Sequence, residues 1–189
     1  GFANRVAELA LDTGHDTVEA LSGTEFADGD SVEDRRQQLV AKLGENIQIR
    51  RIAHMTIDGG TIGHYIHGGR IGVLVGLTGG NEDLARDIAM HVAALNPQYI
   101  DENAVPADVL EQEKAILKAQ AEDSGKPAEI IEKMITGRLR KHLAEITLVG
   151  QPFVKDGDQT VGKLLKSAGA EVVGMVRLEV GEGIEKEES

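Results

Sequence analysis

The stretch from Gly44 to Leu77 constrains the fold more than any other part of this sequence. It reads GENIQIRRIAHMTIDGGTIGHYIHGGRIGVLVGL and contains three runs in which apolar residues alternate with other residues. Such alternation is typical of β-strands. Gly59-Gly60 and Gly68-Gly69 separate the runs, and glycine supplies the positive φ angles that tight hairpin turns need. We therefore predict a three-stranded antiparallel sheet with strands over residues 47–57, 61–67 and 71–77.

Helical patterns lie on both sides of this stretch. Ser31 and Asp34 have the spacing of a capping box, and Gly44 stands where the helix that follows Ser31 ends. Four polar residues, 123–126, join two later helices, which therefore form an antiparallel hairpin. Apolar spacing predicts helices over residues 2–12, 31–43, 81–95, 107–122, 127–143 and 160–168, and further strands over 145–149 and 171–180. Helices plus strands thus occur twice, with the hairpin inserted in the second half.

Composition excludes several classes of function. The 189 residues carry a formal net charge of −12, which argues against a nucleic-acid backbone as the main partner. Three Phe, two Tyr and no Trp are too few for a base-stacking platform, and the lack of Cys excludes thiolate chemistry. No apolar run approaches the roughly 20 residues of a membrane helix. We expect no membrane contact and a partner that is bound through a local patch.

The sequence offers little that could carry chemistry. His64 and His67 are three residues apart on a predicted strand, so their rings point to opposite faces and do not form a metal site. Gly79-Gly80 precedes a helix but is followed by Glu82 and Asp83, which would repel a phosphate. His91 lies near an apolar stripe, which favours a core histidine with one hydrogen bond over a catalytic one. These patterns predict no enzyme, no metal and no cofactor, and favour a binding protein with a projecting helical hairpin.

Several motifs in series resemble the bacterial elongation factor Ts family: LVAKLGENIQIRR, HGGRIGVLV, DIAMHVAALNPQYI, SGKPAEIIEKMITGRL, LVGQPFVKD, TVGKLL and VRLEVGEGIEK. The resemblance covers nearly the whole chain. It implies an α+β fold of two subdomains, each with a small antiparallel sheet plus helices, and an antiparallel helical hairpin inserted in the second. The first subdomain would span residues 1–80 and the second 81–184, with the hairpin at about 106–144 and an acidic tail at 185–189.

The resemblance also implies the function. Members of this family are cytoplasmic guanine-nucleotide exchange factors of the GTPase elongation factor Tu in translation, and they act allosterically. A Thr-Asp-Phe-Val segment disturbs the magnesium and phosphate region of the GTPase, which releases GDP. That segment is expected a few residues before Gly1, after an amino-terminal helical domain, and a carboxy-terminal helix is expected after VGEGIEK. We therefore expect this chain to bind elongation factor Tu, as a one-to-one pair or a two-fold assembly, and to exchange nucleotide slowly.

Five residues match contact positions of the family. Leu43 and Gly44 would face the GTPase domain, and His67, Val154 and Lys155 would contact the distal domain of the partner, although the family often has Met at the position of Lys155. Four of them have a plainer interpretation, because Leu43 and Val154 could be core residues, Gly44 a helix cap and His67 a turn residue. The alternative function is a scaffold or RNA-associated module that uses the basic patch of the hairpin, formed by Arg138, Arg140, Lys141 and His142.

Overall fold

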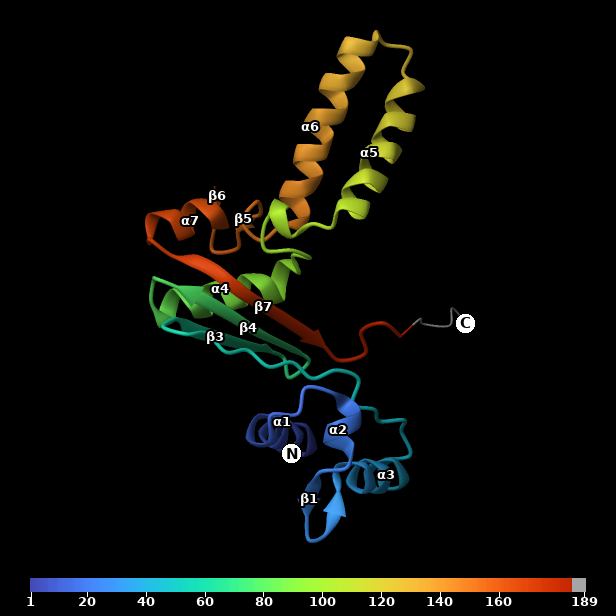
Figure 1. Cartoon of the computed structure of the whole chain (residues 1–189), viewed down its shortest axis with the longest axis vertical. Coiled ribbons are helices and arrows are strands. Elements are labelled where there is room, and N and C mark those ends of the chain that lie inside the picture. The colour runs from blue at the N-terminus through green and yellow to red at the C-terminus, as the bar shows by residue number, and fades with distance from the viewer. Residues whose placement is uncertain (185–189) are drawn as a thin grey trace. The chain divides into compact units, whose positions relative to one another are not determined.

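The computed structural model describes residues 1–184, and these form an α+β structure (Figure 1), as the sequence predicts. The acidic tail expected at 185–189 lies outside the described residues. The chain divides into two compact units, residues Gly1–Thr56 and the part from Ile57 onward. The second unit holds the sheet and the helix that follows it together, and the subdomain boundary near residue 80 stays a prediction.

The first unit contains three helices and a two-stranded antiparallel sheet. Ser31 accepts a hydrogen bond from the Asp34 amide at 3.1 Å and Asp34 accepts one from the Ser31 amide at 2.9 Å, so the predicted capping box is confirmed. The unit has a small core of its own, formed by Val6, Leu9, Ala10, Leu21 and Val32. Its elements are α1 (Phe2–Thr13), α2 (Val18–Ser22), β1 (Glu25–Ala27), β2 (Asp30–Ser31) and α3 (Val32–Leu43).

The strand predicted over residues 47–57 is wrong, because this segment is irregular and pairs with no strand. Ile49 and Ile52 pack against the core of the first unit instead. The carbonyl oxygen of Ile47 accepts a hydrogen bond from the Arg36 guanidinium rather than from a neighbouring strand. Because Ile49 and Ile52 are three residues apart and pack on the same core, the segment does not keep the period of two that a strand requires.

The second unit is built on a three-stranded antiparallel sheet in the order β3-β4-β7. Strands β3 (Thr61–His67) and β4 (Ile71–Thr78) form the predicted hairpin, with Thr61 opposite Leu77 and His67 opposite Ile71. The third strand is β7 (Glu171–Glu179), which pairs with β4 from the other end of the sequence. The three-stranded sheet exists, but its third member differs from the predicted one.

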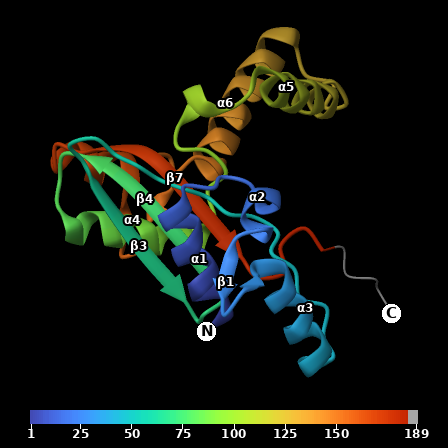
Figure 2. The same cartoon turned by 60° about the horizontal axis from the view of Figure 1, so that its bottom comes forward.

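Helix α4 (Glu82–Leu95) covers one face of this sheet (Figure 2). Gly63 permits the close approach, because a Cβ built there would lie 2.3 Å from the carbonyl carbon of Ala85. The core between helix and sheet includes Val73, Val75, Leu77, Ile88 and Val92. This helix therefore has one face buried against the sheet, and its remaining positions are available to other elements.

The predicted helical hairpin is confirmed. Helices α5 (Ala107–Glu122) and α6 (Ala128–Ile146) run side by side and extend beyond the sheet (Figures 1 and 2). The strand predicted over 145–149 is wrong, because α6 continues through Ile146 and is followed by an isolated parallel bridge between Thr147 and Tyr99, where the Leu148 amide donates to the Tyr99 carbonyl at 2.8 Å. The remaining elements are η1 (Glu102–Ala104), β5 (Pro152–Phe153), β6 (Asp156–Thr160) and α7 (Val161–Ser167).

Candidate partner-binding site

Leu43 and Gly44 form the end of α3 in the first unit. Leu43 is 56% exposed, which excludes the interpretation of this residue as part of the core. Gly44 has a φ of 71° and its amide donates to the Val40 carbonyl at 2.9 Å, which is the geometry of a left-handed helix cap. The cap at Gly44 turns the backbone away from the axis of α3. The exposed Leu43 side chain therefore stays at the end of the helix, where a partner can contact it.

Arg36 fixes the segment that follows this cap. Its guanidinium donates from Nε and Nη2 to the two carboxylate oxygens of Glu33, at 2.8 and 2.6 Å, and from Nη1 to the Ile47 carbonyl at 2.7 Å. Hydrogen bonds from Arg36 and Gln37 lower the pKa of Glu33 to about 2. A side chain on α3 thus holds the backbone three residues after Gly44, a role that the sequence analysis missed.

His67 is the last residue of β3, at the turn into β4. Gly68 and Gly69 both have positive φ angles, and the Arg70 amide donates to the His67 carbonyl at 3.0 Å. The imidazole is exposed and lies beside Tyr65, with the phenol oxygen 3.5 Å from Nδ1 and the ring centroids 6.2 Å apart. The turn interpretation is confirmed, and it leaves the ring available to a partner.

Val154 and Lys155 form the turn between β5 and β6, called here the β5–β6 turn. Val154 is 42% exposed, so its interpretation as a buried residue is wrong. Its amide donates to Nδ1 of His91 at 3.0 Å, and the Lys155 ammonium donates to both carboxylate oxygens of Asp87 at 3.0 Å. Both acceptors are on α4, four residues apart. An exposed turn is therefore attached to a buried helix by two specific contacts.

His91 is fully buried, as predicted, but it makes two hydrogen bonds rather than one. Its Nε2 lies 2.9 Å from Oε1 of Gln151, and its ring stacks on Phe153 with centroids 5.9 Å apart. Burial lowers the pKa of His91, although the Gln151 contact opposes this. The imidazole is consequently neutral in the folded protein near pH 7.

Asp87 and Gln151 were not predicted to take part in this site. The four-residue spacing of Asp87 and His91 puts both on one side of a helix and could have suggested a shared task. Nothing in the sequence connects Asp87 and His91 to Val154 and Lys155, which lie more than 60 positions later. The predicted contact residues lie in separate places: Leu43 and Gly44 in the first unit, His67 at one end of β3, and Val154 and Lys155 in the β5–β6 turn.

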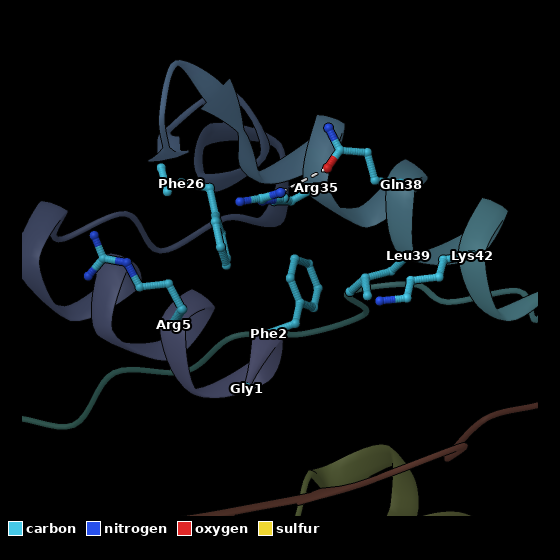
Figure 3. Close-up of a pocket in the computed structure, with 9 residues that line it drawn as sticks. Gly1, Phe2, Arg5, Phe26, Arg35, Gln38, Leu39 and Lys42 are labelled. Carbon is cyan, nitrogen blue, oxygen red and sulfur yellow. Dashed lines mark hydrogen bonds between the residues drawn. The ribbon is translucent and has the colours of Figure 1, made fainter.

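A pocket in the first unit was not predicted. Two stacked rings, Phe2 and Phe26, have centroids 5.5 Å apart, and the Arg35 guanidinium lies 5.7 Å from the centre of the Phe26 ring (Figure 3). Arg35 also donates to Gln38 at 3.0 Å. The other lining residues are Gly1, Arg5, Ala27, Leu39 and Lys42. The pocket therefore combines apolar rings with three cationic side chains in a chain that is acidic overall.

Within residues 1–184, no group of three His, Asp or Glu side chains is arranged to hold a metal ion. None of the helices in this described part combines the length and apolar character that a membrane span needs.

Comparison with known proteins decides the family. The model of the family described as elongation factor TS matches residues 1–182. The chain belongs to the elongation factor Ts family. It is 56% identical over 188 residues to elongation factor Ts of Alcanivorax borkumensis, 59% over 186 to that of Thioalkalivibrio sulfidiphilus, and 57% over 188 to that of Methylococcus capsulatus.

The chain spans less than two thirds of the length of these curated relatives. The matches cover 98–100% of the chain but 66%, 63% and 64% of the three elongation factor Ts sequences. Leu43, Gly44, His67, Val154 and Lys155 all lie inside the region that matches the elongation factor Ts model. Their contact with a partner stays a prediction.

Proposed function

We propose that this chain binds elongation factor Tu and promotes the release of its GDP, as part of a cytoplasmic guanine-nucleotide exchange factor of translation elongation. The observation that carries the proposal is the match of residues 1–182 to elongation factor Ts. The exposed positions of Leu43, His67 and Val154 support it, because a contact residue has to be accessible.

The proposed action is allosteric and needs no catalytic residue or cofactor. Three places on the chain would bind at once: the end of α3 would face the GTPase domain, and His67 and the β5–β6 turn would each bind the distal domain. The binding energy would stabilise a form of the partner whose magnesium and phosphate region is displaced, so that GDP leaves faster. GTP would then displace the exchange factor by mass action.

Release of a fluorescent GDP analogue from elongation factor Tu tests this proposal. We expect the release rate to rise with the concentration of the chain and to increase many-fold further when the Thr-Asp-Phe-Val segment of the family is attached before Gly1. An unchanged rate in both experiments would contradict the exchange function.

Two matched pairs of variants locate the contacts. Leu43→Asp should reduce the release rate, whereas Leu11→Asp should not, since both leucines are exposed helix residues and only Leu43 is a proposed contact. Val154→Asp should weaken binding, whereas Val180→Asp, also at an exposed valine, should not. Equal effects within a pair would contradict the assignment of that contact.

The RNA-associated alternative has less support. On the hairpin, the Lys141 ammonium lies 4.0 Å from a Glu145 carboxylate oxygen, and His142 lies 3.9 Å from Glu113. Acidic side chains thus accompany the basic patch and reduce its attraction for phosphates. Salt-dependent binding of RNA at moderate ionic strength, without binding of elongation factor Tu, would favour the alternative.

Light scattering of the complex with elongation factor Tu would separate a one-to-one pair from a two-fold assembly.

A further inference from the structure

The β5–β6 turn owes its conformation to residues on another element. Phe153 is opposite Asp156 in the β5–β6 pair, so Val154 and Lys155 are the two residues of the connection. The Val154 amide makes its hydrogen bond to the His91 ring and not to a strand, and the Lys155 ammonium is bound by Asp87. We call Asp87 and His91 the α4 anchor.

The donors around His91 determine which of its nitrogens carries the proton. A backbone amide can only donate, so Nδ1 must accept from Val154 and has no hydrogen. Nε2 therefore carries the proton and donates to Oε1 of Gln151 at 2.9 Å, while the Gln151 amide nitrogen donates to the Glu145 carbonyl at 2.8 Å. A continuous chain of hydrogen bonds thus connects the turn, through α4, to the last turn of α6 at the base of the helical hairpin.

Burial makes this series of hydrogen bonds rigid. His91 and Gln151 are both buried, and a buried polar group that loses its partner is costly, so each bond holds the next in place. The His91 ring also stacks on Phe153, the residue that precedes the turn. Val154 nevertheless keeps an exposed side chain. The turn is consequently a fixed apolar projection, beside a lysine whose charge Asp87 neutralises.

We propose that the α4 anchor positions the β5–β6 turn for contact with the partner: His91 holds the Val154 backbone and Asp87 holds Lys155. The turn would then meet an apolar and weakly charged surface of the partner without losing conformational entropy on binding. The inference rests on the proposed function for the identity of that partner. Asp87 and His91 are positioning residues, since they act through the turn.

Two variants of His91 isolate its acceptor. Asn and Leu have nearly the same shape, and Oδ1 of Asn occupies the position of Nδ1, so His91→Asn keeps an acceptor for the Val154 amide and His91→Leu does not. Both variants lose the bond to Gln151 equally. We expect His91→Leu to bind elongation factor Tu on the order of tenfold more weakly than His91→Asn, with the difference in the dissociation rate. Equal affinities of the two variants would overturn the role of His91.

Asp87 can be tested without disturbing the core. Asp87→Asn frees the Lys155 ammonium, and we expect binding about threefold weaker and more sensitive to salt. Asp83→Asn is the matched control, since it removes the same charge from an exposed position one turn earlier on α4. If Asp87→Asn and Asp83→Asn behave alike, the role of Asp87 is wrong. If His91→Leu fails to fold, this pair still tests the half of the anchor that holds Lys155, and the tautomer of His91 tests the other half.

Nitrogen NMR of the free chain supplies a readout that needs no partner. The ¹⁵N shifts should show an unprotonated Nδ1 and a protonated Nε2 for His91, and the Val154 amide shift should move in His91→Leu but stay near the parent value in His91→Asn. The opposite tautomer would overturn the anchor. An observed anchor in a chain that does not bind elongation factor Tu would instead refute the proposed function.

Discussion

Gly63 is the position where the packing of the second unit can be tested most sharply. A Cβ at residue 63 would lie 2.3 Å from the carbonyl carbon and 2.4 Å from the carbonyl oxygen of Ala85, so Gly63→Ala forces α4 away from β3. Overpacking of a core typically costs 1–3 kcal/mol, and a backbone obstacle cannot rotate away, so we expect a loss of about 3 kcal/mol. For an m-value of about 2 kcal/mol/M, the urea midpoint falls by roughly 1.5 M.

The control lies on the neighbouring strand. A Cβ at Gly72 of β4 meets nothing within 4 Å, so Gly72→Ala should leave the stability unchanged or raise it by about 0.5 kcal/mol, because alanine has less conformational freedom to lose. Ala85→Gly should rescue Gly63→Ala at most in part, since it removes the Ala85 Cβ at 2.7 Å but leaves the two nearer backbone atoms of residue 85 in place. Urea unfolding followed by circular dichroism measures all three. A stability of Gly63→Ala within 0.5 kcal/mol of the parent, on the order of ordinary surface changes, would refute this account of the packing.

Three further outcomes are expected. Arg36→Met should return the pKa of Glu33 from about 2 toward its usual range, because the Arg36 hydrogen bonds lower it, and NMR titration of Glu33 measures this; an unchanged pKa would show that the pair is not formed. Burial lowers the pKa of His91, so the unfolded chain binds a proton that the folded chain excludes, and stability should fall as the pH drops below about 6.5. Urea midpoints across this range should show a shallower slope for His91→Asn, and identical slopes would contradict the burial argument. Leu43→Asp and Val154→Asp should leave the free energy of unfolding within about 0.5 kcal/mol of the parent while weakening partner binding, since both side chains are exposed; a large destabilisation would mean that they are core residues.

Short sequence patterns predicted most of the fold. The capping box at Ser31, the glycine pair at the β3–β4 turn, and the polar link between α5 and α6 each predicted a feature that the structure contains. The error at residues 47–57 has a physical cause. Ile49 and Ile52 are three residues apart, so on a strand their side chains would point to opposite faces, yet both pack against the core of the first unit. The strand that replaces this segment, β7, pairs with β4 across about a hundred residues, which no local pattern encodes.

The candidate site also has a part that the sequence predicted and a part that it did not. A series of short motifs was enough to suggest Leu43, Gly44, His67, Val154 and Lys155 as contact positions. The residues that hold the β5–β6 turn were beyond prediction, because Asp87 and His91 meet Lys155 and Val154 only after the chain has folded α4 against the sheet and returned through the helical hairpin. His91 was predicted to be a core histidine, and the core explanation was true but incomplete.

The central claim, that this chain binds elongation factor Tu through the end of α3 and the β5–β6 turn, is tested most directly by calorimetry. Titration of the chain into the GDP complex of elongation factor Tu should give saturable binding, weakened at least tenfold in a Leu43→Asp, Val154→Asp double variant that unfolds at the same urea concentration as the parent. Absence of binding by the parent chain, or equal affinities of the parent and the double variant, would contradict the claim.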